Sequence, residues 1–240
     1  LWLKAVDGVS FELRAGESLG VVGASGCGKS TLCRALMGLN SIRGGRVDLL
    51  GQDLLSLRGE ALRRARRALQ MVFQDPLACL NPALQVADAI ADPLLIHGLC
   101  SKAAAREEAR RLLERVGLSP AEQFQHRLPK QLSGGQQQRV AIARALALKP
   151  KVLICDESVS MLDAEVQADV LALLRELQQE LGLAIVFITH DLSLASGFCH
   201  RVMVLDQGKV VEEGPGDRIF SAPQAAISRT LVEACPLLPR

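Results

Sequence analysis

The segment Gly23–Thr31 has the residue types and spacing of a phosphate-binding loop. It reads Gly-Ala-Ser-Gly-Cys-Gly-Lys-Ser-Thr, which fits the Walker A pattern G-x-x-x-x-G-K-[ST], between an apolar run at Ser18–Gly23 and a helix predicted over Lys29–Gly38. Its glycines let backbone N–H groups turn toward phosphate oxygens, and the positive end of the helix adds to that field. An ordinary glycine-rich turn is the alternative. The residues expected to hold a nucleotide are Gly23, Ser25, Gly26, Cys27, Gly28, Lys29, Ser30 and Thr31.

Two pairs of residues supply the chemistry that such a loop needs. Lys29 offers a point charge between the β and γ phosphates, and Ser30 offers a hydroxyl to Mg²⁺. The run Val152–Glu157 predicts a buried strand that ends in two carboxylates. Asp156 is then expected to hold Mg²⁺, and Glu157 to activate a water for attack on the γ-phosphate. A strand ending in Asp-Glu is weak evidence alone, but behind a Walker A loop it becomes strong.

His190 ends the next predicted strand, in Ile188–Asp191. The carboxyl ends of parallel strands face the ligand crevice, so His190 is expected to reach the phosphate, a structural histidine being the alternative. His97, His126 and His200 have no such setting and are interpreted as structural.

The segment Leu132–Gln136 (Leu-Ser-Gly-Gly-Gln) predicts a second anion-binding helix start. Ser133 can cap the helix, and two glycines free the backbone. Because one nucleotide needs only one phosphate-binding loop, this second element requires an explanation.

The elements that position these residues alternate as in an α/β fold. Continuous apolar runs at Val152–Cys155, Ala184–Thr189 and Arg201–Leu205 are typical of parallel strands covered on both faces. Further strands are expected at Val9–Leu13, Arg46–Leu50, Leu69–Phe73 and Lys209–Val211, and a long helix over Ala164–Leu181. We expect residues 1–75 and 149–213 to form a core with an antiparallel β subdomain, 76–148 an inserted helical subdomain, and 214–240 a C-terminal appendage.

The amino-acid composition excludes several classes of protein. The 240 residues are 49% hydrophobic and 22% charged with a net charge of +2, which excludes a disordered chain and gives no electrostatic reason to expect nucleic-acid binding. Six Phe, one Trp and no Tyr are a poor supply for base stacking. Seven scattered cysteines without C-x-x-C indicate reduced thiols. No apolar run approaches the length of a membrane span.

Together these motifs resemble the nucleotide-binding subunit of an ATP-binding cassette (ABC) transporter. Leu132–Gln136 matches the family signature, Met71–Pro76 the Q-loop with Gln74, and Ser160–Asp163 the D-loop. His190 matches the switch histidine, and the resemblance covers Val6 to Gly214.

The resemblance implies a P-loop NTPase core with a mainly parallel sheet, an antiparallel β subdomain and an inserted helical subdomain. It implies two cassettes packed head to tail, each ATP lying between the Walker A loop of one and the signature of the other. Gln74 would sense Mg²⁺ and the attacking water, and Asp163 would cross the interface. The implied partners are a second cassette, either identical or different, transmembrane permease subunits and, indirectly, a substrate-binding protein. The chain would lie peripherally on the cytoplasmic face of the membrane. Contacts to the partner's nucleotide are implied for Ser133, Gly134, Gly135 and Gln136.

Within the family, softer motifs resemble the dipeptide, oligopeptide and nickel importers. These are Val72–Pro82, Asp156–Ser160, Ile219–Gln224 and the tail Ser228–Pro236. Two alternatives stay open, an exporter subunit and a soluble ABC protein acting on nucleic acid or ribosomes. The arginine run Arg63–Arg67 supports the latter and is otherwise a solvated helix face.

Two features depart from the family pattern. Only Trp2 is available to stack on adenine, and its spacing from the first strand is short, so we expect the stacking aromatic upstream of the given sequence. The tail holds a single cysteine, Cys235, which supports no iron–sulfur site.

Overall fold

The computed structural model describes residues 4–235, which divide into two compact units. The first unit comprises the chain up to Arg66 and from Gly182 onward, and the second runs from Arg67 to Leu181. Trp2, the candidate adenine-stacking residue, lies outside the described residues.

The first unit is built on strands in the order β6–β1–β7–β8. β1 (Ser18–Val22) pairs in parallel with β6 (Ala184–Thr189) and β7 (Arg201–Asp206), and β8 (Lys209–Pro215) runs antiparallel to β7. Every residue of β1 and β6 is buried, which accounts for their unbroken apolar sequence. The parallel strands predicted in this part of the chain are confirmed.

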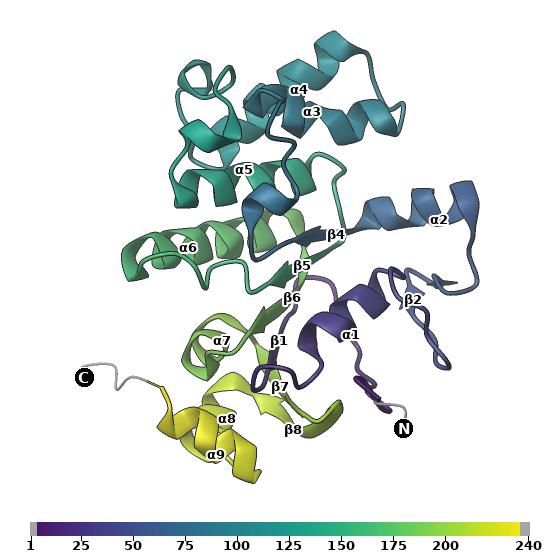
Figure 1. The fold of residues 1–240 in the computed structure, drawn as a ribbon, viewed down its shortest axis with the longest axis vertical. Coiled ribbons are helices and arrows are strands. Elements are labelled where there is room, and N and C mark those ends of the chain that lie inside the picture. The colour runs from purple at the N-terminus through teal and green to yellow at the C-terminus, as the bar shows by residue number, and fades with distance from the viewer. Residues whose placement is uncertain (1–3, 236–240) are drawn as a thin grey trace. The chain divides into compact units, whose positions relative to one another are not determined.

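Helices of the first unit cover its strands and carry the C-terminal segment. The Phe198 ring of α7 lies 5.0 Å from that of Phe187 in β6, centroid to centroid. α8 and α9 pack beside α7 at the end of the described chain (Figure 1). The helices are α1 (Lys29–Leu36), α2 (Gly59–Ala65), α7 (Leu192–Phe198), α8 (Gly216–Ser221) and α9 (Ala226–Glu233).

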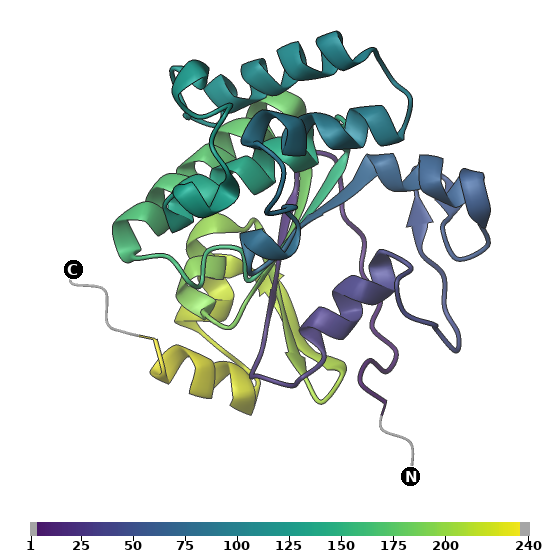
Figure 2. The same cartoon turned by 45° about the horizontal axis from the view of Figure 1, so that its top comes forward.

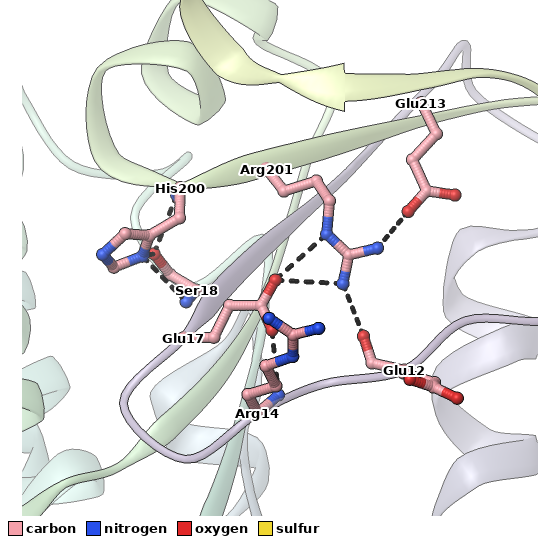
Figure 3. A network of polar contacts seen from close by, with 7 residues as sticks. All are labelled: Glu12, Arg14, Glu17, Ser18, His200, Arg201 and Glu213. Atoms are coloured by element: carbon pink, nitrogen blue, oxygen red, sulfur yellow. Dashed lines mark hydrogen bonds and ion pairs between the residues drawn. The ribbon is translucent and has the colours of Figure 1, made fainter.

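A polar network fastens the amino ends of β1 and β7 (Figure 3). Nδ1 of His200 accepts the backbone N–H of Ser18 at 3.0 Å and lies 2.6 Å from its hydroxyl. The Arg201 guanidinium pairs with Glu17 and Glu213, on either side of it. These contacts give His200 the structural role expected of it.

The predicted strand at Val9–Leu13 is wrong. This segment has no strand pairing, and the carbonyl oxygen of Glu12 instead accepts a hydrogen bond from the Arg201 side chain. The first unit also holds a small, separate antiparallel sheet made of β2 (Asp48–Leu49) and β3 (Gln52–Asp53). The alternation of polar and apolar residues at Val9–Leu13 belongs to a half-exposed segment without a strand partner. One of its backbone carbonyl groups is hydrogen-bonded to a side chain instead of to a neighbouring strand.

The second unit combines two parallel strands with a set of helices. β4 (Leu69–Val72) pairs with β5 (Val152–Asp156), confirming both predicted strands. Helices α3 (Val86–Ile96), α4 (Lys102–Arg115) and α5 (Gly134–Leu146) pack against one another, and they are drawn in teal in Figures 1 and 2. α6 (Ala164–Leu181) follows β5 and buries Val170, Leu173, Leu174 and Leu177. Short 3₁₀ turns lie at Arg66–Ala68, Pro76–Ala78, Ala121–Gln123 and Pro129–Gln131.

Across residues 4–235, no helix is both long and apolar enough to span a bilayer.

Candidate functional site

The phosphate-binding loop of the first unit holds its lysine against the backbone. β1 leads into the loop, and α1 begins at Lys29. The Lys29 side chain is 5% exposed, and its Nζ donates to the carbonyl oxygens of Gly23 (2.7 Å) and Ala24 (3.1 Å). The positive charge therefore lies at the loop and the helix start, where an anion is favoured.

Two physical requirements, lack of space for a Cβ and a positive φ, select glycine in this loop. A Cβ on Gly28 would collide with the carbonyl oxygen of Ala5, and one on Gly23 would lie 2.6 Å from the Cys27 sulfur. Gly26 has open space around it but a φ of +80°, which disfavours any side chain. Packing within the chain thus demands glycine at two of the positions that the sequence pattern assigned to phosphate binding.

His190 and the phosphate-binding loop start from the same edge of the sheet. The register pairs Val22 of β1 with Thr189 of β6, so Gly23 and His190 each follow a paired strand end. The first unit therefore brings these two predicted elements to neighbouring positions, as the strand-end argument expected.

The segment after His190 is held by hydrogen bonds between its side chains and its backbone. Asp191 donates its N–H to the Thr189 hydroxyl at 3.0 Å, and its carboxylate accepts from the N–H groups of Ser193 (2.8 Å) and Leu194 (3.2 Å) at the start of α7. His190 thus sits between a buried strand end and a capped helix.

In the second unit, strand ends bring Gln74 and Glu157 together. The register pairs Val72 of β4 with Cys155 of β5, so Asp156 follows directly and Gln74 lies just beyond. The Gln74 amide Nε2 donates to Glu157 Oε2 at 3.3 Å. This contact orients the Glu157 carboxylate.

The backbone at Glu157 is strained in a way typical of functional positions. Its φ is +45°, a left-handed conformation that non-glycine residues rarely adopt. The Ser160 hydroxyl and N–H both reach the Glu157 carbonyl oxygen, at 2.8 and 3.1 Å, and close the turn that holds it. Two residues before Glu157, complete burial raises the pKa of the Cys155 thiol to about 12. This thiol is therefore protonated and packs in the hydrophobic core.

The signature segment begins a helix with a reciprocal capping box. The Ser133 hydroxyl accepts the Gln136 N–H at 3.4 Å, and Gln136 Oε1 accepts the Ser133 N–H at 3.1 Å, forming a reciprocal capping box. Ser133 and Gly134 are exposed, whereas Gly135 is buried. The exposed part of this helix start can receive an anion.

Sequence reasoning missed Gln137. Its side-chain Nε2 donates to the carbonyl oxygens of Pro129 and Leu132, both at 3.1 Å, and so ties the approach segment to α5. The signal available was the run of three glutamines after the signature glycines, of which only the first was used.

Asp163 caps α6 at the end of the D-loop. Its carboxylate accepts the Val166 N–H at 3.0 Å, and its carbonyl oxygen accepts the Gln167 N–H at 2.8 Å. The residue is exposed, so its carboxylate also faces solvent.

The arginine run Arg63–Arg67 makes contacts within the chain. Arg63 pairs with Glu60 at 2.7 Å, and Arg66 donates to the carbonyl oxygens of Met37 (3.0 Å) and Gly38 (2.8 Å) at the end of α1. These contacts give part of the run a structural role.

Comparison with known proteins places these features in one family. The sequence pattern of the ABC transporter family matches residues 6–160. The chain is 47% identical to the glutathione import ATP-binding protein GsiA of Pectobacterium atrosepticum over 98% of its length and 37% of GsiA's. It is 46% identical to the oligopeptide transport ATP-binding protein OppF of Salmonella typhimurium, over 98% of this chain and 70% of OppF.

Solved structures agree. A dimeric ATP-binding cassette, MJ0796 bound to ADP and phosphate, superposes with a TM-score of 0.78 at 34% identity, covering 88% of this chain and 90% of that one. CbiO1 of Clostridium perfringens, part of the transporter complex cbiONQ, gives 0.81 at 30% identity, covering 91% and 84%. The chain therefore belongs to the ABC transporter family, as one of its ATP-binding and ATP-hydrolysing cassettes.

Proposed function

We propose that this chain powers a membrane importer of peptides or similar small molecules. Its relatives are named as ATP-binding proteins of oligopeptide, di/tripeptide and glutathione import. The observation that carries the catalytic part is the contact between Gln74 and Glu157 at the ends of two paired parallel strands. Nickel import, which the softer motifs also allow, lacks that support from the relatives' names.

Glu157 is the general base of this proposal. Gln74 orients the Glu157 carboxylate, and this carboxylate takes a proton from the water that attacks the γ-phosphate. Lys29 binds the β and γ phosphates, and His190 secures the γ-phosphate from the adjoining strand end.

The donor set fits Mg²⁺. The residues assigned to the metal offer oxygen atoms, the Ser30 hydroxyl, the Asp156 carboxylate and the Gln74 side-chain carbonyl, and Mg²⁺ prefers oxygen ligands. When bound, the ion neutralises charge on the phosphate oxygens.

The signature segment serves a second cassette. The exposed Ser133 and Gly134, with the helix start behind them, complete the nucleotide site of the partner chain, and Asp163 lies at the interface. Residues 76–148 form the helical subdomain that contacts the permease, and the cassette works on the cytoplasmic face of the membrane.

Hydrolysis of Mg-ATP by a Glu157→Gln variant tests the catalytic assignment. We expect turnover to fall about 10²–10⁴-fold with ATP affinity kept, because the amide cannot accept the proton. The exposed Glu165, in the first turn of α6, provides a matched control, and Glu165→Gln should hydrolyse ATP like the wild type. Undiminished turnover in Glu157→Gln would contradict the role of Glu157 as general base.

A further inference from the structure

The two signature glycines face different surroundings. A Cβ built on Gly134 would lie 3.5 Å from Leu162 Cδ2, an ordinary contact. A Cβ on the buried Gly135 would collide with Cγ1 of Val166, the third residue of α6. The first glycine is therefore compatible with a side chain as far as its own chain is concerned, and the second is not.

The collision at Gly135 cannot be relieved easily. Valine is stiff at χ1, so Cγ1 cannot swing aside as the end of a long side chain would. A second contact joins the same two helices, and we call this α5–α6 contact the seam. Arg139, one turn beyond Gly135 in α5, forms an ion pair of 4.0 Å with Asp169, three residues beyond Val166 in α6. The start of α5 is thus seated on the start of α6.

The start of α6 is in turn connected to Glu157. The Val166 N–H donates to the Asp163 carboxylate, and Gln167 Nε2 donates to the Val159 carbonyl oxygen at 3.2 Å. Ser160 closes the turn on the Glu157 carbonyl. A continuous set of short contacts therefore runs from the signature helix to the strained backbone of the general base.

We propose that Val166 is a positioning residue: it fills the space that a Cβ of Gly135 would take, and so fixes the signature helix relative to Glu157. The inference rests on the proposed function. It means that the exposed Ser133 and Gly134, which meet a partner's nucleotide, are held in a fixed position relative to this chain's own general base.

A double-mutant cycle in the full chain tests the fit. Gly135→Ala forces the helices apart, and we expect kcat for ATP to fall about 10-fold or more with the KM for ATP unchanged. Val166→Ala leaves the space empty, and we expect a smaller fall in kcat. Gly135→Ala with Val166→Ala refills the space with two small side chains, and kcat should return close to the wild-type value.

Gly134→Ala is the matched control. Its own chain tolerates the methyl group, so any loss there comes from the exposed face, and Val166→Ala should not restore it. A Gly135→Ala/Val166→Ala variant no more active than Gly135→Ala overturns the inference, as does full activity in Gly135→Ala alone. If Gly135→Ala does not fold, wild-type kcat in Val166→Ala overturns it instead. A wild-type chain without ATPase activity would contradict the proposed function rather than the seam.

Discussion

The two anion-binding helix starts of this protein differ in how they are completed. At α1 the N-cap is Gly28, with φ +111° and no side-chain cap hydrogen bond, and the first turn carries the buried Lys29. At α5 the N-cap is Ser133, whose hydroxyl and backbone are both satisfied by Gln136. The start of α1 offers its N–H groups and a cation to a ligand, whereas the start of α5 is already stabilised by side chains of its own helix.

This difference assigns the two starts different tasks. A helix start that lacks a side-chain cap gains most from a bound phosphate, which suits the loop that holds the nucleotide. A capped start keeps its shape before any ligand arrives, which suits a surface that must meet a partner's nucleotide in a fixed geometry. Substitutions at the two helix starts test this difference.

Lys29→Ala removes the charge from the first helix start. Each hydrogen bond to a charged group contributes about 1.5–3 kcal/mol, and we expect ATP affinity to fall about 100-fold in calorimetric titration. Arg34, on the last turn of the same helix, offers a control, and Arg34→Ala should bind ATP normally. Equal affinity in both variants would mean that the loop does not hold the phosphates.

Gly23→Ala should destabilise the first unit itself. The new methyl group meets the Leu205 carbonyl and the Cys27 sulfur, and overpacking of this kind costs about 1–3 kcal/mol. We expect a lower midpoint of thermal unfolding even without nucleotide. Gly134→Ala, at the start of α5, should change the free energy of unfolding by no more than about 0.5 kcal/mol. A reversed order would contradict the packing argument.

Ser133→Ala separates capping from ligand contact. Loss of an N-cap costs about 1 kcal/mol, which chemical denaturation can measure. Ser133→Asn keeps a capping oxygen and should restore stability, whereas ATP turnover should stay reduced in both because the hydroxyl is gone. Full turnover in Ser133→Asn would show that the residue acts only as a cap.

The smallest effect concerns the ion pair between Asp88 in α3 and Arg106 in α4. The hydrogen bond from Arg106 holds the pKa of Asp88 below its ordinary value. The stabilisation is therefore present above the unfolded pKa, near 3.9, and is lost as pH falls through the lowered pKa. Because both groups are partly exposed, Arg106→Ala should lower the free energy of unfolding only slightly at pH 7, and the difference from wild type should shrink as the pH falls and Asp88 is protonated. A cost independent of pH would assign the effect to packing.

The buried strands and the motif positions could be predicted from the sequence because both rest on local signals. Continuous apolar runs marked β1, β5 and β6, and glycine with lysine marked the start of α1. Val9–Leu13 misled because alternation cannot tell a paired strand from an extended segment whose carbonyl meets Arg201. The fit of Gly135 on Val166 could not be predicted either, because the two residues lie on different helices that only the fold brings into contact.

The measurement that tests the account most directly is the solution mass of the Glu157→Gln protein with and without Mg-ATP. This chain carries both helix starts, so two copies make two complete sites, and slow hydrolysis should hold them together. The account predicts a monomer that becomes a dimer when Mg-ATP is added. A chain that binds Mg-ATP and stays monomeric would contradict the pairing of two copies of this chain through Ser133 and Gly134.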